Sequence, residues 1–188
     1  MILDELIKLM EAEPEAEDIC FNPGASELSV ESLESVIEQD LPDDYWTFLH
    51  EHDGQRRDTK PLLGVYRLMS INEMEIEYIR RVDEARKGHT FSYAGVSDVR
   101  VQAGLDWRPG WLFFAREDAD GNFFVMDFSP TEKGTSGQIF QHCYESPDFR
   151  VLANSFSHLV QITCDQIKAG NHTRYGRMAR YETLEFDS

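Results

Sequence analysis

The sequence has no long hydrophobic run, and its first residues do not have the pattern expected of an export signal. A membrane-spanning helix needs roughly 18 to 20 consecutive apolar residues, and no stretch approaches that length. The chain begins with Met1-Ile2-Leu3-Asp4-Glu5. This start is acidic, whereas a secretory signal starts with basic residues and continues with an apolar segment. We therefore expect a cytoplasmic protein that does not insert into a membrane.

Cysteine is scarce and the common catalytic motifs are absent. Cys20, Cys143 and Cys164 form no CxxC pair, so reduced thiols are expected in a cytosolic chain. The motifs HExxH, GxGxxG, the P-loop and GxSxG do not occur. Only His50 and His52 are close in sequence, and on a helix a spacing of two points them in different directions. We therefore predict no catalytic residue, no metal and no cofactor.

Basic residues are also few. The 188 residues include 18 Lys and Arg against 35 Asp and Glu, a net charge of −17. The first 45 residues hold fourteen acidic residues and one basic residue, Lys8, so their net charge is −13. Such a surface repels nucleic acids and anionic membranes. It favours fast docking of a basic protein, although solubility alone is an alternative explanation of the charge.

What the sequence does contain is enough for one packed domain. Hydrophobic residues make up 41% and aromatic residues 12% of the chain, and a chain of this length suits a single domain better than two. We expect three parts: an N-terminal helix and acidic linker over residues 1–25, an α+β domain over residues 26–170, and a polar C-terminal tail over residues 171–188. The piece from Glu11 to Gly24 is expected to be a loose surface segment.

Apolar residues at helical spacing, together with capping and stop residues, predict five helices. Pro42 is assigned to the first turn of its helix, where proline is favoured, and Asn72 is assigned as a cap. The expected helices cover residues 2–10, Ser26 or Ser29 to Asp40, Pro42 to Gly54, Asn72 to Gly88 and Ser155 to Gly170.

Alternating and apolar segments predict a sheet in the second half of the chain. Asp120-Gly121 is a hairpin signal, and the strand after it is apolar on both faces, which places it in the centre of the sheet. The expected strands cover residues 62–69, a short piece at Val99 and Val101, and residues 111–116, 122–128, 138–144 and 150–153. The order of elements predicts an α+β fold. Its mostly antiparallel sheet has about five to six strands, with N-terminal helices and a C-terminal helix packed on it.

Two segments have more than one interpretation. Glu117 to Asn122 lacks the glycine position and final Glu of a calcium loop. It also lacks the apolar surroundings that would raise the pKa of a catalytic carboxyl, so a solvated turn is favoured. Trp107 and Trp111 flank a rigid turn with Arg108, and this arrangement fits either core packing or a protein-recognition surface.

Two longer motifs lie in a fixed order along the chain. LPDDYWTFL at residues 41–49, followed by Asp53-Gly54, resembles the signature LPxDYxxFL…NG of the SUKH superfamily, which includes the Smi/Knr cell-wall-regulator family. The segment from WRPGWL at residues 107–112 to VLANSF at residues 151–156 is similar to WxPxWxPF…DGGGN…DLxP…GQV…VxAxSF. The matched motif residues are Leu41, Pro42, Tyr45, Phe48, Leu49, Gly54, Trp111, Gly121, Asn122, Asp127, Pro130, Gly137, Gln138, Ser155 and Phe156. Phe113 and the hairpin turn depart from the pattern.

The resemblance implies a single α+β domain that needs no cofactor and catalyses no reaction. Most bacterial members look like immunity proteins that bind and neutralise toxins, often nucleases, and fungal members act as regulators of cell-wall synthesis. We therefore predict an immunity protein that binds a toxin domain with a basic surface. A regulatory scaffold is the alternative, and a small hydrolase using the acidic turn is a third hypothesis. The predicted partner-facing residues are Asp43, Asp44, Trp107, Arg108, Glu117, Asp118 and Asp120; the partner's identity and the oligomeric state stay open.

Overall fold

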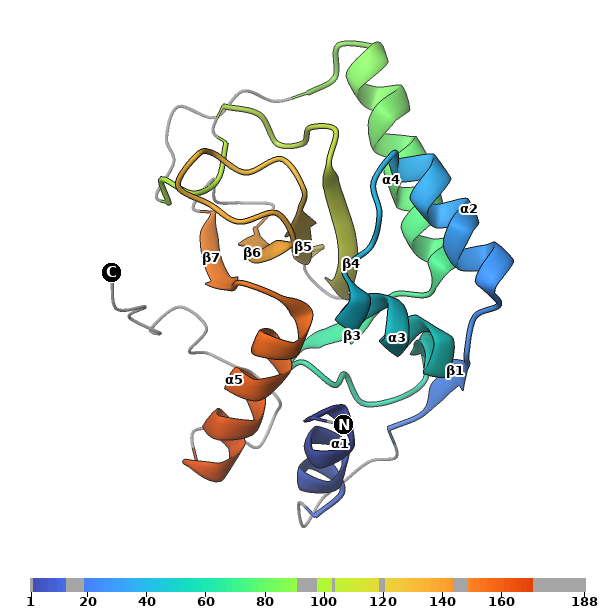
Figure 1. Cartoon of the computed structure of the whole chain (residues 1–188), viewed down its shortest axis with the longest axis vertical. Helices are drawn as coiled ribbons and strands as arrows, with labels where there is room; N and C mark the ends of the chain where they lie inside the picture. Colours follow the sequence, from blue (N-terminus) through green and yellow to red (C-terminus); the bar gives the residue numbers. More distant parts are fainter. Residues whose placement is uncertain are drawn as a thin grey trace.

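The computed structural model describes residues 2–12, 19–90, 98–102, 104–118, 121–143 and 149–170. The linker residues 13–18 and the tail 171–188 lie outside these ranges. Figure 1 shows the helices arranged around a sheet. In chain order the elements are α1 (Ile2–Glu11), β1 (Phe21–Pro23), α2 (Glu27–Ile37), α3 (Asp43–Glu51), β2 (His52–Gln55), β3 (Tyr66–Leu68), α4 (Ile71–Arg86), β4 (Trp111–Glu117), β5 (Phe123–Asp127), β6 (Gln138–His142), β7 (Arg150–Ala153) and α5 (Phe156–Lys168).

The main sheet is an antiparallel meander in the order β3-β4-β5-β6-β7. β5 lies in its centre, and all five of its residues are buried because the sheet is covered on both faces. The register pairs Phe113 with Val125 and Met126 with Ile139. The predicted α+β fold with a mostly antiparallel sheet is therefore confirmed, as is the central place of this strand.

The helices pack on the sheet and on one another. α4 packs against β4, α5 packs against β6 and β7, and α2 packs on α4. α1 packs on α5, and Figure 1 shows it at the far end of the molecule from the tip of α4. Aromatic rings fill the space between α3, α5 and the sheet: the Tyr45 ring centroid lies 5.5 Å from that of Phe114 and 5.0 Å from that of Phe156.

Serine caps begin three of the helices. The Ser26 and Ser155 hydroxyls accept hydrogen bonds from the N–H groups of Ser29 and His158, as serine at an N-cap does. The predicted cap of α4 at Asn72 is wrong, because Ser70 caps this helix and forms a capping box with Glu73. Pro42 is the N-cap of α3 and does not lie in its first turn.

Two short strands were not predicted. β1 lies in the segment expected to be loose, and β2 lies where the helix from Pro42 was expected to continue; the two pair antiparallel. A Cβ atom on Gly24 would lie only 1.9 Å from the carbonyl oxygen of His50. The chain can therefore pass this close to the end of α3 only because Gly24 has no side chain.

The segment 98–102 forms no strand, so the prediction at Val99 and Val101 is wrong. The Asp98 carboxylate organises the segment instead: it accepts hydrogen bonds from the Arg100 N–H at 3.0 Å and the Val151 N–H at 3.1 Å. A side chain that forms hydrogen bonds with backbone groups takes the place of the hydrogen bonds between strands. The pattern of apolar residues carries no information about such bonds, so the prediction could not include them. The predicted strand 62–69 is reduced to β3.

No helix in the described ranges has the length and apolar character required to cross a membrane. Cys20, Cys143 and Cys164 form no disulfide bond, and Cys164 is buried.

Candidate functional site

The first family motif contributes to the core. Leu41, Tyr45, Phe48 and Leu49 are buried, and the Tyr45 hydroxyl donates to Sδ of Met74 at 3.3 Å. Burial raises the pKa of Tyr45, which therefore stays protonated. This motif stabilises the joint between α3, α4 and α5 and presents no reactive group at the surface.

The second family motif builds a buried polar junction. Gln138 Nε2 donates to the Asp127 carboxylate and to the Arg100 carbonyl, each at 3.0 Å. The other carboxylate oxygen of Asp127 accepts from the Ser129 N–H at 2.9 Å. Burial raises the pKa of Asp127, although these hydrogen bonds act in the opposite direction. The junction joins the ends of two strands to the segment 98–102.

The two predicted acidic residues at the start of α3 have different surroundings. Asp43 is exposed and lies in the first turn. Asp44 is half-buried, and its Oδ2 accepts the Ser157 N–H at 2.8 Å. Because Ser157 lies at the start of α5, Asp44 satisfies a backbone donor at the positive end of that helix. Asp43 is thus the member of this pair that is open to a partner.

Trp107 is a core residue in the structure. Its side chain is 4% exposed, and its ring packs edge to face on Tyr78 with centroids 5.6 Å apart. Arg108 is half-buried, and its Nη1 donates to Gln102 Oε1 at 2.8 Å. Of the two interpretations of this segment, core packing is the one that agrees with the buried position of Trp107.

The predicted residues of the hairpin turn lie at the other end of β4. The Glu117 carboxylate accepts from Asn122 Nδ2 at 2.8 Å, and Gly121 has φ +71°, as a tight turn requires. Asp118 is exposed and pairs with Arg116 at 3.0 Å. Asp120 lies outside the described residues.

These placements do not form one continuous patch. Trp107 and Arg108 come before the first residue of β4. Glu117 is the last residue of that strand, and Asp118 follows it. A strand of this length separates its ends by about 20 Å. The structure therefore does not bring the two predicted groups together, although either group alone can contact a partner.

Sequence reasoning missed a buried ion pair. Arg67, 1% exposed, donates from Nη1 to Glu73 at 3.0 Å and lies 3.4 Å from Asp118. Glu73 also meets Arg57. The guanidinium and backbone partners outweigh burial and lower the pKa of Glu73 to about 2. No local sequence pattern predicts this pair, because in β3 Arg67 is a single charged residue between the apolar residues Tyr66 and Leu68.

A second buried cluster surrounds Arg81. Its guanidinium lies 3.6 Å from the centre of the Phe113 ring and pairs with Glu77 at 2.7 Å. His142 packs on the same Phe113 ring and contacts the Asp106 carbonyl through Nε2 at 2.8 Å. Burial, and then the nearby Arg81 charge, lower the pKa of His142 to about 4. His142 is therefore neutral at pH 7.

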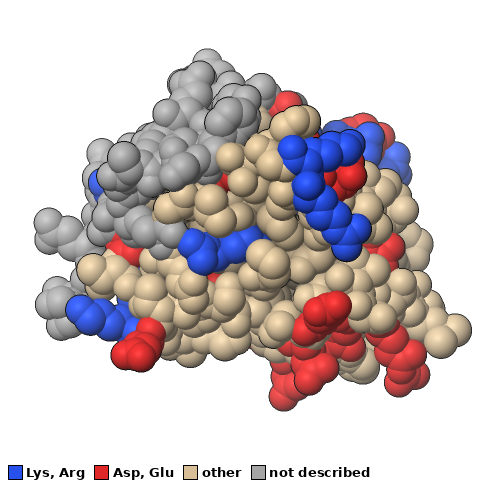
Figure 2. Space-filling model, turned by 90° about the horizontal axis from the view of Figure 1, so that it is seen from above, with Lys and Arg blue, Asp and Glu red and all other residues tan. Residues whose placement is uncertain are grey.

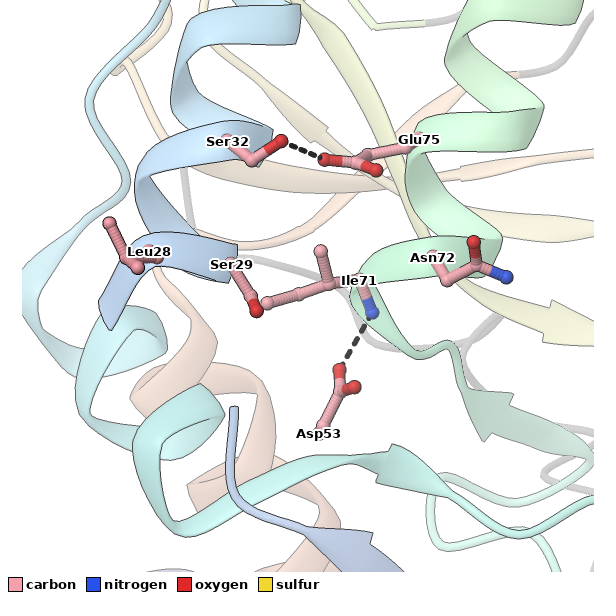
Figure 3. Close-up of a pocket in the computed structure, with 7 residues that line it drawn as sticks. All are labelled: Leu28, Ser29, Ser32, Asp53, Ile71, Asn72 and Glu75. Atoms are coloured by element: carbon pink, nitrogen blue, oxygen red, sulfur yellow. Dashed lines mark hydrogen bonds between the residues drawn. The ribbon is translucent and has the colours of Figure 1, made fainter. Parts of the chain in front are cut away.

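An open hollow of about 320 Å³ lies between α2, β2 and the start of α4 (Figure 3). Asp53 accepts the Ile71 N–H at 2.7 Å, and Glu75 accepts the Ser32 hydroxyl at 2.9 Å. Desolvation, together with the charge of Glu73, raises the pKa of Asp53. The hollow is lined by Leu28, Ser29, Ser32, Asp53, Ile71, Asn72 and Glu75. Within the described residues, neither lining carboxylate has a basic partner.

The described residues contain no group of three or more His, Cys, Asp or Glu placed to hold a metal ion. Three carboxyl groups with a shifted pKa belong to structural contacts: Asp127 to the polar junction, Glu73 to the buried ion pair and Asp53 to the start of α4. The arrangement is that of an α+β domain whose motif residues maintain the fold.

The chain belongs to the SMI1 / KNR4 family (SUKH-1), whose profile matches residues 24–161. The resemblance predicted from the two motifs is therefore confirmed. Over 168 residues the chain is 32% identical to the "Cell wall biosynthesis/cell cycle regulator smi1" of Schizosaccharomyces pombe. This match covers 81% of the chain and 32% of the relative, so the chain spans about a third of the relative's length.

Proposed function

We propose that this chain is a non-enzymatic binding protein that acts by capturing another protein with a basic surface. The observation that carries the proposal is the uneven negative charge. Fourteen of the acidic residues lie in the first 45 positions against one basic residue. On α2, Glu27, Glu31 and Glu34 have no basic neighbour on the same helix. A field of one sign steers an oppositely charged partner to the surface and raises the association rate.

The placement of the family motifs supports a binding role. Tyr45 and Phe48 are in the core, and Asp127 and Gln138 bind each other inside the fold. A hydrolase that used the acidic hairpin turn would need a carboxyl group of perturbed pKa beside a substrate cleft at that turn. The hypothesis that the acidic hairpin turn is a hydrolase site has no such support, because Glu117 and Asp118 are engaged with Asn122 and Arg116.

The specific role that we propose is immunity: the chain neutralises a toxin domain, such as a nuclease, by occupying its phosphate-binding surface. Nucleases present basic side chains to their substrate, so an acidic protein can compete for that surface. The test is co-expression with candidate toxin domains, scored for survival of the cells. Protection by the wild-type chain supports the proposal, and survival equal to that with an unrelated acidic protein contradicts it.

A second candidate is a regulatory adaptor for cell-wall synthesis. It is favoured by the similarity to the fission yeast regulator, although the chain spans only about a third of that protein. The chain would be expressed in a fission yeast strain that lacks smi1 and scored for resistance to wall-digesting enzyme. Restored resistance would favour the adaptor, and toxin protection without restored resistance would favour immunity.

A further inference from the structure

Large apolar side chains are exposed along α2 and α4 beside the hollow. Leu28 is 78% exposed, and Ile76 and Ile79 are 60% and 55% exposed. Asn72, Glu75, Ile76 and Ile79 recur at intervals of three and four, so they share one side of α4. Leu28 and Ser32 share one side of α2 for the same reason. A cluster of exposed apolar residues with a polar surround is typical of an interaction surface.

The charge at the hollow has one sign. The Asp53 and Glu75 carboxylates lie at the hollow, and Glu27 and Glu31 are exposed further round α2. None of the four has an ion pair within the described ranges. Figure 2 views the molecule from the top of Figure 1, the end at which α4 finishes, and shows acidic side chains gathered at the lower right of that face and basic side chains at its centre, upper right and lower left.

The basic residues of this region are paired with carboxylates that do not line the hollow. Arg57 and Arg67 are bound to Glu73, which is two residues from both Ile71 and Glu75. A step of two on a helix turns the side chain by about 200°, so Glu73 and its partners lie away from the hollow, on the side of α4 that Ile76 borders. Arg80, four residues after Ile76, is paired with Glu77 and Glu84. The half-buried Asp53 carboxylate, already destabilised by desolvation, is thus left without a cation.

We infer that the α2/α4 surface, defined as Leu28, Ser32, Asp53, Asn72, Glu75, Ile76 and Ile79, is the docking site for a basic, apolar-faced segment of the partner protein. A Lys or Arg of that segment enters the hollow, with its aliphatic stem against Leu28 and Ile71 and its cation at Asp53 and Glu75. Apolar side chains beside it cover Ile76 and Ile79. The inference rests on the proposed function and names the surface through which it operates.

Charge complementarity decides between possible occupants. A phosphate-bearing ligand or a nucleic acid is repelled by Asp53 and Glu75. A second copy of the chain that docked through its own hollow and α2, which carries no basic residue, would bring acids against the same acids. A basic partner gains both the ion pairs and the apolar contact, because burial of Ile76 and Ile79 removes apolar area from water.

The probe is a synthetic 15-residue helical peptide with Lys and Leu on one face, compared with a scrambled peptide of the same composition. Binding is measured by fluorescence anisotropy, and the site is mapped through backbone amide shifts in NMR spectra. We expect the largest shifts at Ser32, Asn72, Glu75, Ile76 and Ile79. The Leu28→Ser and Glu75→Gln variants should each raise Kd about tenfold, the effect of truncating a principal contact residue.

The matched controls are Val99→Ser, which removes an exposed apolar side chain elsewhere, and Glu132→Gln, which removes one exposed charge. Both should leave Kd within about twofold of wild type, and thermal unfolding should confirm that all four variants fold. Equal binding of the scrambled peptide, equal effects of the controls, or no binding would overturn the inference. If Leu28→Ser and Glu75→Gln lose the peptide but still protect cells against a toxin, the docking site is wrong and the proposed function stands.

Discussion

Gln138 donates a hydrogen bond to Asp127 at 3.0 Å, and neither side chain has any exposed surface. The same amide nitrogen donates to the Arg100 carbonyl, and the Gln138 side-chain oxygen accepts the Thr135 N–H at 3.2 Å. One glutamine therefore joins β5, the turn before β6 and the segment 98–102. A fully satisfied buried network of this kind specifies a single arrangement of the segments that it joins.

Gln138→Met should destabilise the protein by about 2 to 3 kcal/mol. The substitution keeps the size of the side chain but removes three hydrogen bonds and leaves the buried Asp127 carboxylate with fewer donors. The free energy of unfolding would be measured by urea denaturation at pH 7. Gln39→Met is the control, because Gln39 is exposed. A change in Gln138→Met no larger than in the control would mean that the junction does not stabilise the fold.

The sequence predicts the elements that depend on local rules. Ser26 and Ser155 are found as helix caps, and the apolar strand after Asp120-Gly121 lies in the centre of the sheet as expected. These features depend on residues close in the chain, whose capping, periodicity and turn preferences are independent of the rest of the molecule.

Features that depend on long-range contacts could not be predicted. β1 and β2 are strands only because the two segments pair with each other in the folded chain. A glycine is required at position 24 only because the backbone there packs against the His50 carbonyl. The candidate surface is similar: Leu28 and Glu75 lie 47 positions apart and meet only when α2 packs on α4. The sequence predicted acidity near the N-terminus, but not the hollow that Asp53 and Glu75 line.

The Arg67–Glu73 ion pair predicts a loss of stability in acid. Its partners lower the pKa of Glu73 to about 2 from an ordinary value near 4.5. A carboxyl group whose pKa is lower in the folded state contributes its stability above the unfolded pKa and loses it as the pH falls through the folded pKa. The contribution of Glu73 is therefore complete above pH 4.5 and is lost between about pH 4.5 and 2.

Glu73→Gln tests this assignment. At pH 7 the variant should be less stable by about 3 kcal/mol, because Arg67 keeps its charge in the interior without its main counter-ion. The difference between wild type and variant should shrink as the pH falls from 4.5 towards 2. Glu132→Gln, at an exposed position, should show neither effect. A pH-independent difference would show that the charge of Glu73 is not the cause.

His142 predicts a second loss of stability in a higher pH range. Its folded pKa of about 4 lies below the ordinary value of 6.5, so the unfolded chain binds the extra proton more readily. Folding is then opposed as the pH falls from 6.5 towards 4, by an amount on the order of 3 kcal/mol. The His142→Gln variant should lose this part of the pH dependence, measured by urea denaturation from pH 7 to 4.

The matched control for that measurement is His89→Gln, because His89 is exposed. The free energy of unfolding of this variant should depend on pH in the same way as that of wild type. If His142→Gln keeps the full wild-type slope between pH 6.5 and 4, other groups are responsible for it. The comparison between pH 6.5 and 4.5 reports on His142 apart from Glu73, because the contribution of Glu73 changes only below about pH 4.5.

The first helix should stabilise the fold although it lies outside the family match at residues 24–161. Leu3, Leu6 and Met10 of α1 are buried, and α1 packs against α5. Glu5 also pairs with Lys168 at 2.6 Å. An apolar helix face covered in this way contributes through area removed from water, whereas the exposed ion pair adds little.

Leu6→Ala should therefore destabilise the protein by about 2 to 4 kcal/mol, the usual result of opening a cavity at a fully buried leucine. Leu28→Ala makes the same chemical change at a side chain that is 78% exposed, and it should change the free energy of unfolding by no more than about 0.5 kcal/mol. Both values come from urea denaturation of the full chain. If the two variants are equally stable, α1 is not part of the cooperative unit, because a helix that detaches before global unfolding cannot transmit the loss of Leu6 to the measured transition.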